Sequence, residues 1–214
     1  GVGQGPDGGG AGKTMIASTY KRVLLKVSGE ALAGEQAFGI EREFLDKVAQ
    51  QVVDLATTGI QIAIVIGGGN IFRGMAVAAS GSDRVIGDQM GMLATVINAL
   101  AVGDAIRRLG GKSHVFSNVS MPTIAETFTQ RAGIAALEEG AIVICAGGTG
   151  SPFFTTDTAA ALKAVELKCD VLLKGTKVDG VYDSDPATNP DAKRFDEISH
   201  EEVIARNLRV MDTA

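Results

Sequence analysis

The stretch from Ile60 to Ile66 is apolar at every position but one, and three glycines follow it at once. An apolar run that does not alternate with polar residues is typical of a strand buried on both faces, as in a parallel sheet covered by helices. Further apolar runs lie at Val23 to Val27, Ala141 to Cys145 and Val171 to Leu173. The sequence therefore predicts one sheet whose strands are buried between layers of helices.

Segments with a helical period separate these strands. Helices are expected at Phe44 to Leu55, Met90 to Leu109, Ile134 to Glu139 and Thr158 to Lys168, with a short strand at Val115 and Phe116. In the longest helix the apolar positions are Leu93, Ile97, Leu100 and Ile106. Strands that alternate with helices favour parallel pairing. The predicted fold class is α/β, a three-layer αβα sandwich with a mostly parallel central sheet.

Composition narrows the function classes. The chain has 214 residues, 45% of them apolar, which suits one domain or a closely joined pair of lobes. Its net charge of −5 and its lack of a basic stripe argue against nucleic acid as a partner. No apolar run is judged long enough to span a membrane, and no secretory signal opens the chain. A cytoplasmic protein with no membrane partner is therefore expected.

Cysteine and histidine are scarce, which limits redox and metal chemistry. Cys145 and Cys169 form no C-x-x-C pair, so both are expected to be reduced and structural, as suits the cytoplasm. The only histidines are His114 and His200, so a His-rich metal site is not expected.

The first nineteen residues differ from the rest, because they are rich in glycine and show little periodicity. They are expected to be a disordered leader or a remnant of cloning, with one domain over residues 20–214. Gly12, Lys13 and Thr14 resemble the end of a phosphate-binding P-loop. That pattern needs a glycine where Asp7 stands and a strand before it, so a P-loop is not expected.

Polar, mostly glycine-rich loops follow four of the predicted strands. They are Lys26 to Glu30, Gly67 to Asn70, Gly147 to Pro152 and Lys174 to Lys177. In open α/β sheets ligands bind beyond the carboxyl ends of the strands, so the four loops describe one shared site. Glycine lets backbone N–H groups approach a phosphate, and a helix N-terminus after such a loop adds positive partial charge.

Four cations lie on or just after these loops, namely Lys26, Arg73, Lys174 and Lys177. Phosphoryl transfer requires that the reactants are held in line and that the charge on the moving group is neutralised. Lysine supplies a point charge for phosphate oxygens, and arginine can grip two oxygens at once. Asp157 is expected to cap the helix that follows it, and it could also orient a lysine or a metal.

Five segments resemble bacterial uridylate (UMP) kinases, in the same order along the chain. They are K-V-S-G-E (26–30), G-G-G-N-I-F-R-G (67–74), G-D-Q-M-G-M-L-A-T (87–95), G-T-G-S-P-F-F-T-T-D (148–157) and T-K-V-D-G-V-Y-D-S-D-P (176–186). That family belongs to the amino-acid-kinase fold group, and the resemblance runs from about Tyr20 to Ala214. The segments around Asp88 and at 148–157 are the more specific to the uridylate enzymes.

The resemblance implies transfer of the γ-phosphoryl group of ATP to UMP, with catalytic roles for Lys26, Arg73 and Asp157. The implied ATP-binding residues are Lys26, Val27, Ser28, Gly29, Gly69, Arg73, Thr176, Tyr182 and Asp185. The implied UMP-binding residues are Gly68, Asp88, Thr149, Gly150, Ser151, Pro152, Phe153, Phe154, Thr155 and Thr156. One of the two phenylalanines is expected to pack in the protein and the other to line the acceptor pocket. Asp88 could also serve as a helix cap.

The resemblance further implies regulation, assembly and a metal. GTP would activate the protein and UTP would inhibit it. The loop implied for GTP consists of Gly34, Glu35, Gln36, Ala37, Phe38 and Gly39. The chains would form a homo-oligomer, a hexamer. Magnesium would accompany ATP, held largely by phosphate oxygens and water rather than by a dedicated protein site. Family members continue through a further helix and closing strands, which are expected to be missing after Ala214.

Two other functions share part of this pattern. A kinase of the same group that acts on a carboxylate or carbamate would share Lys26, the glycines at 67–69 and the segment 176–180, but would not need the Asp88 segment in this form. A non-catalytic relative that stores metal oxyanions with bound ATP could relax its acceptor-site residues. The retention of Arg73, Asp88 and the loop 149–156 favours catalysis.

Overall fold

At the centre of the protein lies a parallel sheet. The computed structural model describes residues 19–71, 81 and 83–175. Within them the sheet has six strands in the order β4-β3-β5-β2-β1-β6, and all neighbours run parallel. The strands are β1 (Arg22–Val27), β2 (Gln61–Ile66), β3 (Ser113–Ser117), β4 (Glu126–Thr127), β5 (Ile142–Ala146) and β6 (Val171–Gly175). The parallel sheet predicted from the sequence is confirmed.

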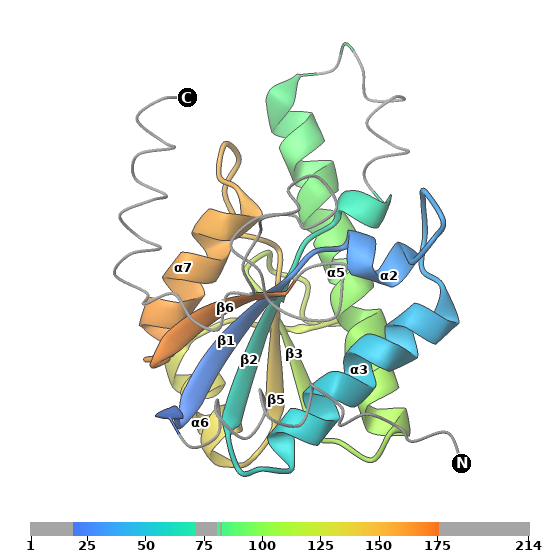
Figure 1. Cartoon of the computed structure of the whole chain (residues 1–214). Coiled ribbons are helices and arrows are strands. Elements are labelled where there is room, and N and C mark those ends of the chain that lie inside the picture. Colours follow the sequence, from blue (N-terminus) through green and yellow to red (C-terminus); the bar gives the residue numbers. More distant parts are fainter. Residues whose placement is uncertain (1–18, 72–80, 82, 176–214) are drawn as a thin grey trace, which may run out of the picture.

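Helices cover both faces of this sheet (Figure 1). They are α2 (Glu30–Ala33), α3 (Arg42–Ala56), α5 (Arg84–Arg108), α6 (Gln130–Glu138) and α7 (Thr156–Glu166). One buried cluster joins the sheet to α2, α3 and α5, and a second joins the opposite face to α6 and α7. The predicted three-layer α/β sandwich is therefore confirmed, although the short α2 and the two-residue β4 were not foreseen.

Strand β2 shows why the apolar runs lack alternation. Ile62 and Ile64 point into the α3–α5 cluster, whereas Ala63 and Val65 point into the α6–α7 cluster. All four are at most 3% exposed. Because successive side chains of a strand face opposite sides of the sheet, both faces need apolar residues. Full burial of a side chain such as Ile64 contributes roughly 1.5–3 kcal/mol.

The helix α5 packs a different face from the one that its large apolar residues suggest. Of the apolar positions that predicted this helix, Leu93, Ile97 and Leu100 are 52%, 48% and 38% exposed, so they do not lie on its packed face. Ile106, the fourth of these apolar positions, is fully buried. The packed face otherwise carries mostly small side chains, among them Ala94, Ala99, Val102, Gly103 and Ala105.

A close approach between α5 and the sheet explains why small side chains, and not the large apolar ones, occupy the packed face. A Cβ atom added to Gly103 would lie 3.0 Å from Cγ2 of Val115 and 3.4 Å from Cδ1 of Ile144. Large side chains on this face would push the helix away from β3 and β5, so small ones occupy it. The periodicity of large apolar residues therefore marks an outer edge of α5.

By length and composition alone, α5 could cross a membrane, which corrects the expectation that no segment could. In the structure α5 packs against β2, β3 and β5 on one side and against α3 on another. Its buried residues include the polar Thr95 and Asn98. These contacts are those of a core helix in an α/β sandwich.

Two helix caps differ from expectation. The N-cap of α7 is Thr155, whose Oγ1 accepts a hydrogen bond from the backbone N–H of Thr158 at 3.1 Å, so Asp157 is a first-turn residue and not the cap. The N-cap of α5 is Asp83, whose carboxylate accepts from the backbone N–H of Val85 at 2.8 Å. Asp88 therefore lies inside the helix, where its side chain is available for other contacts.

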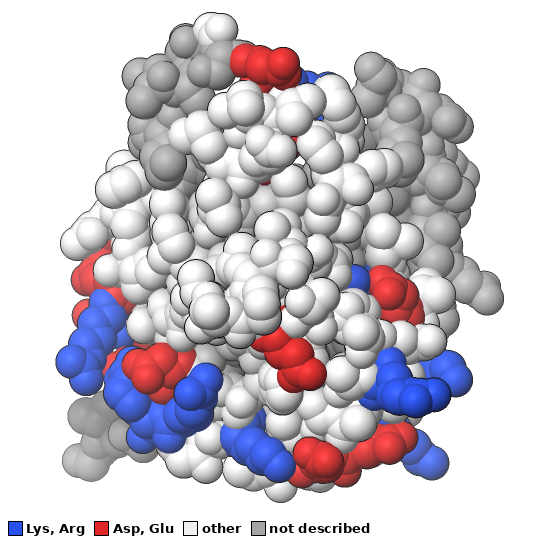
Figure 2. All heavy atoms as spheres, turned by 180° about the vertical axis from the view of Figure 1, so that it is seen from behind, with Lys and Arg blue, Asp and Glu red and all other residues white. Residues whose placement is uncertain are grey.

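Charged side chains are unevenly spread over one face of the molecule. On the face in Figure 2 they gather toward the lower end and leave most of the rest uncharged. Ion pairs at the amino ends of the strands include Lys112 with Glu139, in the turns before β3 and β5, and Arg108 with Asp46, 3.1 Å apart. The lysines at the carboxyl ends of β1 and β6 therefore lie far from this charge-rich end.

Candidate functional site

The loops singled out in the sequence follow four neighbouring strands, because β5, β2, β1 and β6 are adjacent in the sheet. All four strands run in the same direction, so their carboxyl ends meet at one edge. The structure thus brings together the segments that begin at Lys26, Gly67, Gly147 and Lys174. This edge is where α/β sheets bind ligands.

Two lysines and one aspartate form the charged centre of this edge. Lys26 and Lys174 are direct neighbours in the parallel pairing of β1 with β6. The carboxylate of Asp157, in the first turn of α7, lies 3.2 Å from Nζ of Lys26 and 3.4 Å from Nζ of Lys174. One carboxylate thus holds two ammonium groups side by side, at side-chain exposures of 22% for Lys26 and 37% for Lys174.

The pKa of Asp157 reports this environment. Burial by itself would raise the pKa of this carboxyl, but the charges of Lys26 and Lys174 and their hydrogen bonds outweigh burial and hold the pKa below its ordinary value of 3.8. Asp157 is therefore a carboxylate at neutral pH. The cluster carries a net positive charge, which suits a phosphate ligand.

The turn after β1 lies directly against the turn after β2. A Cβ atom at Gly29 would lie 2.5 Å from Oδ1 of Asn70, 2.6 Å from the carbonyl oxygen of Gly67 and 2.9 Å from the backbone N of Gly69. The backbone N–H of Gly67 also donates to the carbonyl of Val27 at 2.9 Å. Only glycine fits at position 29, so the backbones of the two turns approach as closely as a cradle for phosphates requires.

Helix α5 closes the other side of the Gly67–Gly69 turn. A Cβ atom at Gly68 would lie 2.8 Å from Cβ of Ala94 and 3.2 Å from the carbonyl oxygen of Gly91. The turn is therefore confined between the Gly29 turn and α5.

Asp88 meets the loop that follows β5. Its Oδ2 accepts a hydrogen bond of 2.6 Å from the backbone N–H of Phe153, which has a φ of +70°. In the same loop Gly147, Gly148 and Gly150 also have positive φ. The two segments that most resemble the uridylate enzymes thus touch each other, although they are far apart in the sequence.

Both phenylalanines of this loop are exposed, Phe153 by 55% and Phe154 by 44%. The expectation that one of the rings packs in the protein is wrong. The guanidinium of Arg84 lies 4.9 Å from the centre of the Phe153 ring, within the range of a cation–π contact.

The loop Gly34–Gly39 reaches the same edge through Asn70. The backbone N–H of Gly39 donates to the carbonyl of Asn70 at 2.8 Å, and Nδ2 of Asn70 donates back to the carbonyl of Gly39 at 3.0 Å. The side chains at 35–38 are exposed. The structure thus joins this loop to the turn after β2.

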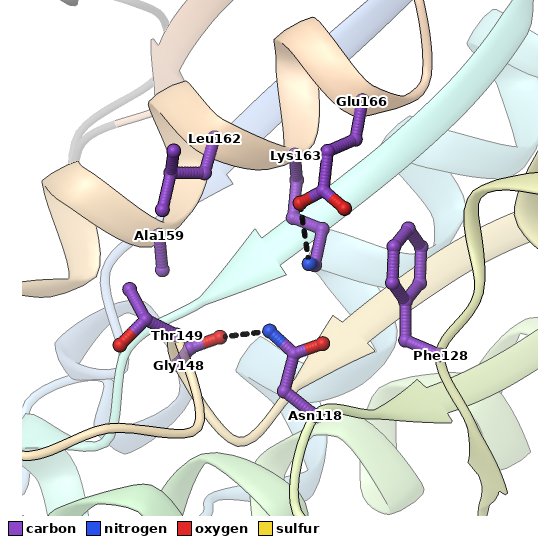
Figure 3. Close-up of a pocket in the computed structure, with 8 residues that line it drawn as sticks. All are labelled: Asn118, Phe128, Gly148, Thr149, Ala159, Leu162, Lys163 and Glu166. Atoms are coloured by element: carbon purple, nitrogen blue, oxygen red, sulfur yellow. Dashed lines mark hydrogen bonds and ion pairs between the residues drawn. The ribbon is translucent and has the colours of Figure 1, made fainter.

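A cavity of about 260 Å³ lies behind the loop after β5, on the α6–α7 face (Figure 3). Within it, Nζ of Lys163 pairs with Glu166 at 2.9 Å and lies 3.8 Å from the centre of the Phe128 ring. Nδ2 of Asn118 donates to the carbonyl of Gly148 at 2.7 Å. These polar groups bind one another and the loop, so the cavity wall supports the loop from behind.

Sequence reasoning missed Asn70, Thr95, Asn98 and Asn118 as site residues. A polar residue on the packed face of an apolar helix is the signal that could have identified Thr95 and Asn98, because a buried polar side chain needs a partner. Several expected site residues lie outside the described part of the chain, so the structure describes no position for them: Arg73, Thr176, Lys177, Tyr182 and Asp185. The Gly12–Thr14 segment, where no P-loop is expected, also lies outside it.

The sequence of this chain is similar to those of uridylate kinases. The uridylate kinase of Bartonella henselae is 56% identical over 198 residues, which cover 92% of this chain and 83% of that protein. The uridylate kinase of Brucella anthropi is 56% identical over 195 residues, which cover 91% and 81%.

Solved structures of UMP kinases have a similar fold. The UMP kinase from Bacillus anthracis has a TM-score of 0.73 and 38% identity, with 82% of this chain and 72% of that chain covered. The UMP kinase from Ureaplasma parvum has a TM-score of 0.73 and 35% identity, with 90% and 82% covered. The sequence model of the amino acid kinase family matches residues 21–213. The chain belongs to the amino acid kinase family.

Proposed function

We propose that this protein is a uridylate kinase, which transfers the γ-phosphoryl group of ATP to UMP and releases ADP and UDP. The observation that carries the proposal is the Lys26–Asp157–Lys174 cluster at the carboxyl edge of the sheet. Two confined glycine turns lie beside this cluster, and the loop that Asp88 holds begins at the same edge. The 56% identity to two uridylate kinases supports UMP as the acceptor.

The donor and the acceptor occupy opposite sides of the turn after β2. ATP phosphates are held by Lys26, the backbone of Ser28 and Gly29, and Gly69. UMP is held by Gly68, Asp88 and the loop 149–156, which includes Thr149, Gly150, Ser151, Pro152, Phe153, Phe154, Thr155 and Thr156. Helix α7 begins directly after this loop, and the positive end of its dipole favours an anion there.

An oxygen of the UMP phosphate attacks the γ-phosphorus, and the bond to the β–γ bridging oxygen breaks. The ammonium groups of Lys26 and Lys174 neutralise charge on the transferred group and on the leaving ADP. Direct transfer needs no protein nucleophile. The two cysteines, Cys145 and Cys169, are buried, and burial raises the pKa of each thiol to about 12, so neither supplies a thiolate.

The described site fits magnesium as part of the Mg·ATP complex. Asp157 already faces two ammonium groups, and the described residues hold no group of three or more His, Cys, Asp or Glu side chains arranged for a metal. The ion would be carried mainly by phosphate oxygens and water, and it would neutralise phosphate charge. Lys26 and Lys174 then position the phosphates that carry it.

The test is a coupled ADP-release assay with Mg·ATP and UMP, CMP, dTMP, acetylglutamate and carbamate as separate acceptors. Preferential turnover of UMP is expected, and preferential turnover of acetylglutamate or carbamate would overturn the proposal. Replacement of Lys26 by alanine should lower kcat far more than it raises the KM for UMP, because the charge acts mainly in the transition state. An unchanged kcat would remove Lys26 from the mechanism.

Regulation and assembly extend the proposal. GTP activates through the loop Gly34–Gly39, whose hydrogen bonds to Asn70 link it to the turn between the substrates. UTP inhibits, and the chains form a homo-oligomer, a hexamer in the cytoplasm. The exposed apolar side chains of Leu93, Ile97 and Leu100 on α5 support burial against another copy. Light scattering with and without GTP measures the mass, and a monomer under both conditions would refute assembly.

A further inference from the structure

Two polar side chains interrupt the packed face of α5. Thr95 and Asn98 are 6% and 0% exposed, and their neighbours on the same face, Ala94, Ala99 and Val102, are apolar. The two residues are three positions apart, so they lie on one side of the helix, one turn from each other. A buried polar side chain destabilises the fold unless it makes hydrogen bonds, so Thr95 and Asn98 need partners.

Asn98 binds the turn that follows β2. Its Nδ2 donates to the carbonyl of Gly67 at 2.7 Å. Asn98 also makes a reciprocal amide pair with Asn70, with N···O distances of 2.7 and 3.0 Å between the two side chains. Asn70 in turn donates to the carbonyl of Gly39. One buried side chain of α5 thus fixes both ends of the Gly67–Asn70 turn.

Thr95 binds the turn that follows β5. Its Oγ1 accepts a buried hydrogen bond of 2.9 Å from the backbone N–H of Gly147 and donates to the carbonyl of Met92 at 2.6 Å. Gly147 has a φ of +81° and begins the loop that Asp88 holds further along. A single face of α5 therefore holds this loop through two side chains, Asp88 and Thr95, and the Gly67–Asn70 turn through one, Asn98.

We propose that Thr95 and Asn98 are positioning residues, which set the distance between the donor and acceptor phosphates by tying the two turns to one helix. This inference rests on the proposed kinase function for its kinetic consequences. The rise between the two residues along a helix is fixed, so the turns cannot separate without breaking a buried hydrogen bond. A transfer that needs its reacting atoms within about 3–3.5 Å depends on such fixed spacing.

Thr95 acts on one substrate and Asn98 on both. Thr95 holds only the loop that wraps the acceptor, whereas Asn98 holds the turn that lies between donor and acceptor. Loss of the Thr95 hydroxyl therefore weakens UMP binding and leaves ATP binding intact. Loss of the Asn98 amide disturbs the alignment of both nucleotides and lowers kcat.

The kinetic test uses substitutions that preserve shape. Thr95→Val removes the acceptor for Gly147 and is expected to raise the KM for UMP about tenfold, with the KM for ATP within about twofold of wild type. Thr95→Ser keeps Oγ1 and should restore most of the UMP affinity. Asn98→Leu should lower kcat by about tenfold or more. Equal changes in both KM values for Thr95→Val, or no rescue by serine, would overturn the assignment.

Amide hydrogen exchange tests the same inference without turnover. Thr95→Val should speed exchange at residues 147–150 but not at 67–70, and Asn98→Leu should do the reverse. Ser113→Ala is the matched control, because Ser113 donates to the carbonyl of Gly103 in α5 at the opposite end of the sheet. Its exchange at both turns should equal that of wild type.

The two failures are distinguishable. If wild-type protein turns over no UMP, the proposed function fails, and the exchange pattern alone decides whether α5 positions the turns. If exchange rises equally at both turns in each variant, or matches the Ser113→Ala control, the side chains serve packing only and the inference is refuted.

Discussion

Replacement of Gly29 by alanine tests the close contact between the two glycine turns. Gly29 has φ −58° and ψ −28°, a conformation that alanine adopts freely. Backbone strain therefore cannot account for an effect at this position. Any loss of stability or activity must come from the contacts of the added methyl group.

Those contacts are severe. The Cβ atom would lie 2.5 Å from Oδ1 of Asn70 and 2.6 Å from the carbonyl of Gly67, whereas ordinary contact begins at 3.4 Å. The turns must therefore separate by nearly 1 Å, and both atoms belong to a turn already confined by α5. Overpacking of this kind costs about 2 kcal/mol, or about 4–8 °C in Tm for a chain of this size. A misplacement of about 1 Å between reacting groups lowers kcat by about 100-fold.

Gly91→Ala is the control for Gly29→Ala. Gly91 lies in α5 with nothing within 4 Å of an added Cβ, so its substitution should leave kcat unchanged and raise stability slightly, by up to about 1 kcal/mol. Differential scanning calorimetry gives Tm, and the ADP-release assay gives kcat. If Gly29→Ala behaves like Gly91→Ala in both measurements, the turns are not packed as described.

Three further measurements probe other parts of the molecule. Because burial raises the pKa of both thiols to about 12, Cys145 and Cys169 should resist iodoacetamide at pH 8 until denaturant is added, and rapid native alkylation would contradict their burial. Because the pKa of Asp157 is lowered in the folded state, its carboxylate stabilises the fold above pH 3.8, and this stabilisation is lost as pH falls through the folded-state pKa. In urea unfolding, the excess stability of wild type over Asp157→Asn should therefore shrink on acidification. A constant difference would be inconsistent with the ion pairs. Thr155→Ala should cost about 1 kcal/mol through the lost N-cap of α7 and also raise the KM for UMP, whereas Thr129→Ala, which removes the N-cap of α6, should affect stability alone.

The sequence predicted the sheet well because burial on both faces leaves an unambiguous signature. The runs at Val23 to Val27 and Ile60 to Ile66 are short and lack polar alternation, and glycine-rich or polar loops follow them, which together indicate strands buried on both faces. It did not show which face of α5 packs, because Leu93 and Ile97 repeat at helical spacing and are nevertheless exposed. Apolar periodicity shows where large apolar side chains recur along a helix. The packed face of α5 is decided instead by how closely the helix approaches the sheet, which favours small side chains.

For the candidate site, the sequence predicted the loops but not what holds them. Lys26 and Asp157 could be singled out because charged residues at strand ends and helix starts carry a recognisable chemistry. The role of Asn98 depends on contacts with Gly67 and Asn70, which are 31 and 28 residues away in the chain. Such pairings follow from the strand order, which no local pattern encodes.

The strand order also explains why neighbouring glycines of one turn are expected to serve different nucleotides. In the order β5-β2-β1-β6, the loop that meets Asp88 follows β5, and the lysines lie on β1 and β6. Strand β2 lies between them, and neighbouring strands are about 4.8 Å apart. Among the described loops, the turn after β2 therefore lies between the loop that meets Asp88 and the two lysines, so Gly68 is expected to contact the acceptor and Gly69 the donor. A substitution that moves this turn should impair both substrates, whereas changes in the outer loops should impair one.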